Sequence, residues 1–210
     1  MTELHFRSAS DLGRIMRRRE LSSVELTGHY ISRIEKFDGK TNAVVARDFD
    51  RAMSLAKQAD EAFARDEILG PLHGLPFTIK DAYEVEGIVS TGGNPAWKDH
   101  VPAHSAVAVE RLQRAGGIVM GKTNVPYLSG DLQSYNDIYG TTNNPWALEC
   151  GPGGSSGGSA ASYPHLRAPA HPEHLGTRLR HHNKQTTTTC HTLPLLASPH
   201  PPHPQLDHTP

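Results

Sequence analysis

The densest group of small and hydroxyl-bearing residues is the run Gly-Pro-Gly-Gly-Ser-Ser-Gly-Gly-Ser at 151–159. Glycine lets a backbone approach a substrate closely and adopt torsion angles that other residues avoid. Serine supplies hydroxyl groups that can both donate and accept a hydrogen bond. A run of this composition is also typical of a flexible linker, and a glycine-rich loop that opens a helix can bind phosphate. The run alone therefore leaves a linker, a phosphate loop and a catalytic loop as interpretations.

A lysine ends the apolar segment that runs from Leu75 to Lys80. The stem of its side chain is expected to lie along apolar surface, and such a lysine commonly extends its ammonium group to water. The alternative is a buried lysine that is held neutral as a base. Lowering its pKa from about 10.4 to about 7 takes roughly 4–5 kcal/mol of differential destabilisation of the charged form, which burial can supply. A base of that pKa suits proton abstraction from serine.

The segment from Gly116 to Thr123 matches the nucleotide-binding pattern G-x-x-x-x-G-K-[ST]. A phosphate-binding loop of that kind follows a strand and opens a helix. Here the apolar residues Ile118 to Met120 occupy the interior of the loop, and Pro126 interrupts the region where the helix would form. We therefore expect a buried strand in place of a nucleotide site, with Lys122 either in a structural role or supporting a neighbouring site residue.

Hydrophobic periodicity predicts the elements that must position these residues. Helices are expected near 10–18, 22–37, 49–65 and 105–115, and strands at 43–46 and ending at Ile79 and Met120. Strands that alternate with helices favour an α/β fold with a parallel or mixed sheet.

The predicted helix ends follow from capping residues. Ser10, Ser22 and Ser105 are the expected N-caps, Ser22 forms a capping box with Glu25, and Gly39 is a stop signal. The helix at 105–115 is expected to turn these apolar residues inward: Ala108, Val109, Leu112 and Ala115.

Residues 163–210 differ from the rest of the chain. They hold nine of the 14 histidines and nine of the 16 prolines, and no Val, Ile, Met, Phe or Trp. Such a segment cannot bury enough apolar surface to offset about 1–2 kcal/mol of backbone entropy per ordered residue. We expect an ordered part at 1–162 and a disordered tail at 163–210. Metal binding by the histidines is the alternative, but no His-x₃-His pair lies on an expected helix, so we expect no metal.

Overall charge and cysteine content limit the classes of function. The net charge of the 210 residues is −1, which gives no electrostatic footprint for nucleic acid or an anionic membrane. No apolar run reaches the length of a membrane span, and the first residues lack the pattern of a signal peptide. Cys150 and Cys190 are too few for a disulfide framework, so we expect a cytoplasmic protein.

Four segments occur in the order that is typical of the amidase signature family. They are Gly74–Asp81, Gly121–Asn124, Gly140–Pro145 and Gly153–Ser159. The resemblance extends from about Leu21 to Ser162, and the family includes bacterial amidases and the A subunits of tRNA-dependent amidotransferases. A linker or a chance nucleotide motif would account for one of these segments, but not for all four in order.

The resemblance implies a mixed sheet flanked by helices and hydrolysis of a small-molecule amide without metal or organic cofactor. It makes Lys80 the general base and Ser155, after a cis bond from Gly154, the residue that relays a proton to it. Ser156 and Ser159 would support the loop by hydrogen bonding. The loop-forming glycines would be Gly153, Gly154, Gly157 and Gly158.

The resemblance ends after Ser162. The family places its nucleophilic serine one helix further on, in a Gly-Gly-Ser turn, whereas the one serine of the tail, Ser198, has no glycine near it. A frameshift is the simplest explanation, and a genuine alternative terminus is the other. We therefore expect an incomplete amidase-family hydrolase that lacks its nucleophile and is inactive. A non-catalytic binding or interaction fragment is the alternative, and the sequence does not indicate an oligomeric state.

The composition of the tail gives a direct test. Because residues 163–210 lack the hydrophobic side chains of a core, their amide hydrogens should exchange at the rates of an unfolded chain. Hydrogen exchange followed by mass spectrometry measures this segment by segment. Slow exchange throughout the segment would contradict the prediction.

Overall fold

The structure is a computed structural model, and it describes residues 4–166. The chain divides into two units, Met1–Pro172 and Glu173–Pro210, and all described residues belong to the first. The expected disorder at 167–210 lies outside the described residues. Residues 163–166 were expected to belong to the tail, but the last helix continues through them to Leu166.

Five α-helices and three short 3₁₀ turns form the helical part of the described residues. The helices are α1 (Ala9–Arg17), α2 (Ser23–Thr41), α3 (Phe49–Ala64), α4 (Val107–Arg114) and α5 (Gly157–Leu166). The 3₁₀ turns are Leu4–Phe6, Pro95–Trp97 and Tyr127–Ser129. None of the helices in the described part of the chain is long and apolar enough to cross a membrane.

Two sheets complete the fold. The main sheet contains β1 (Val44–Arg47), β2 (Pro76–Lys80) and β3 (Ile118–Thr123), and a small hairpin pairs β4 (Tyr135–Asn136) with β5 (Gly140–Thr141). In the main sheet β3 is central, parallel to β2 and antiparallel to β1. The sheet is therefore mixed, and the prediction of an α/β fold is confirmed. Every residue of β3 is buried, which confirms a strand where the nucleotide-binding pattern had matched.

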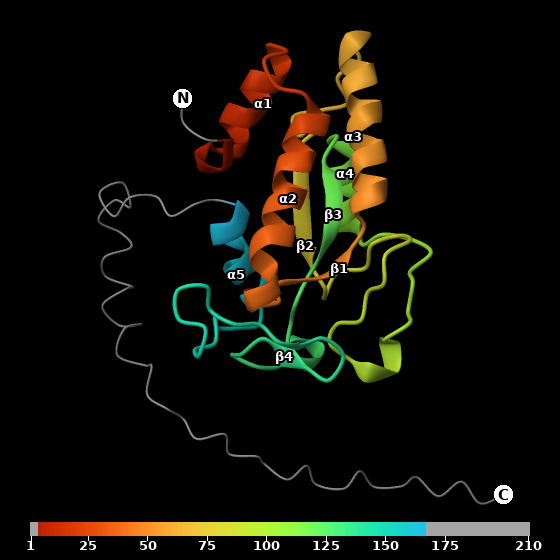
Figure 1. The fold of residues 1–210 in the computed structure, drawn as a ribbon. Helices are drawn as coiled ribbons and strands as arrows, with labels where there is room; N and C mark the ends of the chain where they lie inside the picture. Colours follow the sequence, from red (N-terminus) through yellow and green to blue (C-terminus); the bar gives the residue numbers. More distant parts are fainter. Residues whose placement is uncertain (1–3, 167–210) are drawn as a thin grey trace, which may run out of the picture. The chain divides into compact units, whose positions relative to one another are not determined.

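Helices cover both faces of the main sheet. Helices α2 and α3 stand side by side over one face, and α4 lies on the other (Figure 1). The larger core joins the first face to these helices through side chains such as Ile34, Ala56 and Met120. The smaller core joins Val109 of α4 to Val119 of β3. Each face of the central strand is thus packed, as a near-continuous apolar strand requires.

The pairing of β2 with β3 is interrupted by one extra residue. Phe77 pairs with Val119, but the next residue of β2, Thr78, pairs with Gly121. Met120 is therefore a β-bulge, which leaves one residue unpaired and changes the face to which the following side chains point.

The C-terminal end of α2 is tied to a distant loop. Asn42 caps the helix in the left-handed conformation, and its side-chain amide donates to the carbonyl oxygen of Tyr139 at 2.6 Å. The Thr142 hydroxyl donates back to the carbonyl oxygen of Asn42 at 2.8 Å. These bonds hold the β4–β5 hairpin against the C-terminal end of α2.

Several helix ends differ from the sequence-based expectation. The capping box of Ser22 and Glu25 is confirmed, but α2 passes Gly39 and ends at Thr41. Ser8, not Ser10, caps α1, because Ser8 is extended and its hydroxyl accepts from the Asp11 amide. The Ser105 hydroxyl accepts from the amide of Glu86 and so does not cap α4.

The inward face of α4 was also predicted incorrectly. Val109 is the buried residue of this helix, whereas Ala108 and Leu112, both expected inward, are exposed. Helix α4 therefore joins the smaller core through Val109.

The two serines at the start of α1 provide a matched test of the cap. Ser8→Ala removes the acceptor for the Asp11 amide and should lower the free energy of unfolding by about 1 kcal/mol. Ser10→Ala should change it by less than about 0.5 kcal/mol, because Ser10 is an exposed residue inside the helix. Urea denaturation of both variants measures the difference, and equal effects would contradict the assignment of the cap.

Candidate active site

A lysine and a serine from distant segments meet at the end of the main sheet. Lys80 is the last residue of β2, and Ser155 lies two residues before α5 begins. The Lys80 ammonium donates to the Ser155 hydroxyl, with 2.7 Å between Nζ and Oγ. The expected contact is therefore present, and the ammonium does not simply extend to water. Partial burial lowers the pKa of Lys80 below its usual value.

Backbone geometry brings Ser155 to this position. The Gly154–Ser155 peptide bond is cis, as the resemblance implied. Gly154 packs against the backbone of the preceding loop, so that a Cβ there would lie only 2.6 Å from the carbonyl oxygen of Asp131. Any larger residue at 154 would force this loop and Ser155 apart.

The Ser134 side chain holds the Gly/Ser loop in place through two hydrogen bonds. Its hydroxyl donates to the carbonyl oxygen of Gly153 at 3.1 Å and accepts from the amide of Gly157 at 2.9 Å. The amide of Gly158 donates to the carbonyl oxygen of Asn124 at 3.1 Å. The loop is thus held on both sides of Ser155, which argues against a flexible linker. Sequence analysis missed Ser134, because an isolated serine in a loop carries no pattern.

The two supporting serines differ in their surroundings. The Ser159 hydroxyl lies 2.7 Å from the Thr123 hydroxyl, at the end of β3. Ser156 is exposed, and its carbonyl oxygen accepts from the amide of Ala160 in the first turn of α5. Ser159 therefore links α5 to the sheet, whereas Ser156 precedes α5 and bonds to its first turn through its backbone carbonyl.

Asn124 connects the sheet to the β4–β5 hairpin. Its side-chain nitrogen donates to the Thr142 hydroxyl at 2.9 Å, and its side-chain oxygen accepts from the Asn136 amide at 2.8 Å. All three side chains are buried. Asn124 and Thr142 lie in segments that sequence analysis had singled out, but no pattern predicted their contact.

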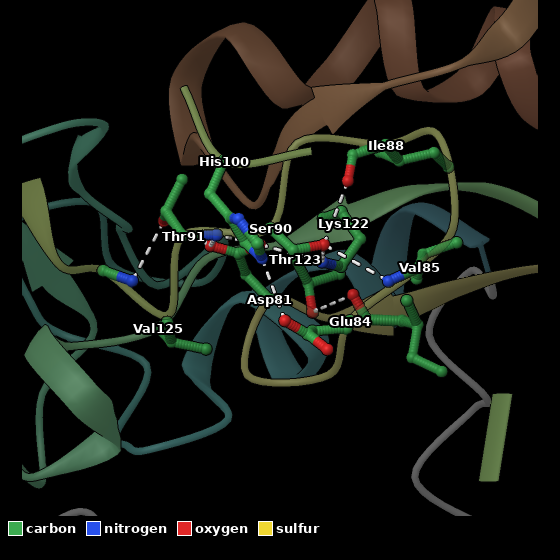
Figure 2. A network of polar contacts seen from close by, with 12 residues as sticks. Asp81, Glu84, Val85, Ile88, Ser90, Thr91, His100, Lys122, Thr123 and Val125 are labelled. Atoms are coloured by element: carbon green, nitrogen blue, oxygen red, sulfur yellow. Dashed lines mark hydrogen bonds and ion pairs between the residues drawn. The ribbon is translucent and has the colours of Figure 1, made fainter. Parts of the chain in front are cut away.

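A buried ion pair lies beside Lys80 on the chain. The Lys122 ammonium is 2.9 Å from the Asp81 carboxylate and donates to the Ser90 hydroxyl at 2.7 Å (Figure 2). Both charged side chains are fully buried. Burial lowers the pKa of Lys122, and the Asp81 carboxylate acts in the opposite direction. Asp81 is thus the charged partner of Lys122, which agrees with the structural role expected for this lysine.

No group of three or more histidine, cysteine or acidic side chains among residues 4–166 is arranged to hold a metal ion.

Comparison with known proteins identifies the family of the chain. The model of the Amidase family matches residues 25–163, and the chain belongs to the amidase signature family. Two curated relatives are glutamyl-tRNA(Gln) amidotransferase A subunits. That of Moorella thermoacetica is 39% identical over 160 residues, and that of Cutibacterium acnes is 36% identical over 169 residues. The matches cover 76% and 80% of this chain but 33% and 34% of the relatives, so the chain spans about a third of their length.

Solved structures give the same result. Fatty acid amide hydrolase superposes with a TM-score of 0.74 at 28% identity, over 77% of this chain and 29% of its own. The peptide amidase of Stenotrophomonas maltophilia superposes with a TM-score of 0.69 at 32% identity, over 74% of this chain and 33% of its own. The fold of the described residues is that of the corresponding part of amidase-signature enzymes.

The lowered pKa of Lys80 predicts a pH dependence of stability. Between the pKa of Lys80 in the folded chain and the usual 10.5, the unfolded chain binds a proton that the folded chain has released. The free energy of unfolding of the wild type, relative to Lys80→Met, should therefore rise as the pH rises through this window. Above 10.5 the difference should be constant.

Urea denaturation at a series of pH values measures this difference. Lys98→Met, at an exposed lysine, serves as the reference for loss of one lysine from the surface. A difference that does not change with pH would show that Lys80 keeps its usual pKa in the folded chain.

Proposed function

We propose that this chain carries the proton-transfer part of an amide hydrolase, with Lys80 as the base and Ser155 as the relay. The observation that carries the proposal is the 2.7 Å hydrogen bond between their side chains. The lowered pKa of Lys80 supports it, because a base must be neutral before it can accept a proton. Membership of the amidase family gives the bond to be broken as a carboxylic amide.

The proton path follows from this contact. A nucleophilic hydroxyl that attacks the amide carbonyl carbon loses its proton to the Ser155 oxygen, and the Ser155 proton passes to neutral Lys80. The return of this proton to the leaving amine completes the acyl transfer, and water then releases the acid by the same path. Lys80 and Ser155 thus take the part that a histidine base has in the serine hydrolase triad.

We further propose that the 210-residue chain does not itself supply the nucleophile. The Ser159 hydroxyl is engaged with Thr123, and Ser156 is exposed at the start of α5. The one serine of the tail, Ser198, lies in the sequence Ala-Ser-Pro-His and lacks a neighbouring glycine to shape a turn. The backbone donors that stabilise an oxyanion, each worth about 10²–10³ in rate, would be absent with that turn.

This proposal predicts no measurable turnover of simple aliphatic or aryl amides by the purified chain. Release of ammonia or arylamine measures it. Turnover that Lys80→Ala abolishes would show instead that a serine of this chain, Ser156 or Ser159 first, serves as the nucleophile.

A chimera tests the role of the lysine directly. It joins residues 1–162 of this chain to the remaining part of the Moorella thermoacetica relative, which supplies the regions that the match does not cover. The chimera should hydrolyse amides, and Lys80→Ala should lower its kcat by about 10²–10⁴-fold. Lys98→Ala, at the surface, is the matched control and should leave kcat unchanged.

A further inference from the structure

The β-bulge at Met120 decides which way Lys122 points. With the observed register, Ile79 pairs with Lys122 and Lys80 pairs with Thr123. If Met120 were paired in a regular register from Phe77–Val119 onward, Lys122 would instead be paired with Lys80. Paired residues on parallel strands point to the same face of the sheet, and the strands are about 4.8 Å apart. The bulge therefore keeps two lysines from facing each other and turns Lys122 to the opposite face.

On that opposite face Lys122 has a carboxylate to bind. Asp81 follows Lys80 directly, so its side chain leaves the extended backbone on the other side. One carboxylate oxygen of Asp81 accepts from Lys122 at 2.9 Å, and the other accepts from the Thr91 hydroxyl at 2.6 Å. Figure 2 shows the three side chains converging in this network.

The backbone of Asp81 is fixed as well. Its amide donates to the carbonyl oxygen of Thr123 at 3.0 Å, which extends the pairing of β2 with β3 by one residue. Its carbonyl oxygen accepts from the amide of Gly92 at 3.3 Å. Asp81 is therefore held by its side chain, its amide and its carbonyl together. Lys80, in contrast, contacts Ser155, which lies in a loop 75 residues further along the chain.

We propose that the buried Lys122–Asp81 pair is a positioning device for Lys80, which holds the end of β2 where the Lys80 amine reaches Ser155. This role rests on the proposed function of Lys80 as the base. The Asp81 and Lys122 side chains are both fully buried, so we assign them a positioning role and not a catalytic one. Their effect passes through the backbone of β2, and the bulge at Met120 is what makes the pair geometrically accessible.

A double variant separates positioning from charge. Lys122→Met alone would leave the Asp81 carboxylate buried and unpaired, which is strongly destabilising. Asp81→Asn combined with Lys122→Met removes one charge of each sign, so the net charge near Lys80 is unchanged. The amide oxygen of the introduced asparagine can still accept from Thr91. Ser90 keeps its bonds to Val85 and Ile88, so the double variant should fold.

The measurement is the pH dependence of Lys80 acetylation in the full 210-residue chain, followed by peptide mass spectrometry. In the wild type the midpoint should lie below the usual 10.5. In the double variant it should move upward toward 10.5, because the end of β2 loosens and Lys80 becomes hydrated. If the midpoint rises by about one pH unit, the labelling rate near neutral pH falls about tenfold.

Leu12→Ala in helix α1 is the control for a general loss of stability, since it removes a buried side chain outside this network. Its labelling midpoint should equal that of the wild type. A double variant with the wild-type midpoint would overturn the positioning role while leaving Lys80 as a base of lowered pKa. A wild-type midpoint at 10.5 would instead contradict the proposed function, and the positioning role with it.

Discussion

The parallel pairing of β2 with β3 is the constraint on which the site depends. It brings Lys80 and Thr123 to the same edge of the sheet, where each meets one serine of the Gly/Ser loop. Two strand ends therefore hold two points of the loop, Ser155 and Ser159. Because carboxyl ends of parallel strands lie together, side chains from separate parts of the sequence can be arranged here without a long-range motif. The backbone of the loop then needs only to fit against this edge.

The two faces of the main sheet differ in the interactions that they make. The face toward α2 and α3 is mainly apolar and provides the cohesion of the larger core. The opposite face contains the smaller core and, next to it, the buried Lys122–Asp81 pair. Buried ion pairs contribute little net stability compared with apolar side chains of the same size, but they demand one geometry. The presence of the Lys122–Asp81 pair beside Lys80 is therefore better explained by the orientation that it gives to the end of β2 than by its contribution to stability.

The sequence predicted the parts of the structure that local patterns encode. The apolar repeat of α3, the capping box of α2 and a buried strand beginning at Ile118 are all local, and all were found. The strand ends were misplaced, because β3 continues past Met120 to Thr123 and β2 ends at Lys80, not Ile79. The order of four motifs predicted the contact between Lys80 and Ser155, which no local pattern contains. The cap of α1 was placed at Ser10 in place of Ser8 because both serines satisfy the same pattern, and only the backbone conformation of Ser8 distinguishes them. Ser134 and the bulge at Met120 could not be predicted, because each depends on register between strands or loops that periodicity does not specify.

The bonds between Asn42 and the Tyr139–Thr142 segment have a consequence for the order in which the molecule assembles. They join residues about one hundred positions apart. The bond between Lys80 and Ser155 spans 75 positions. On a ribosome that adds about 5–20 residues per second, the end of α2 leaves the exit tunnel seconds before its partners exist. Contacts between residues so far apart in sequence form late and slowly, because the chain loses the entropy of closing a long loop before the contacts stabilise it. The helices and the first strands can collapse early, whereas the lysine acquires its serine only when synthesis has passed the Gly/Ser loop.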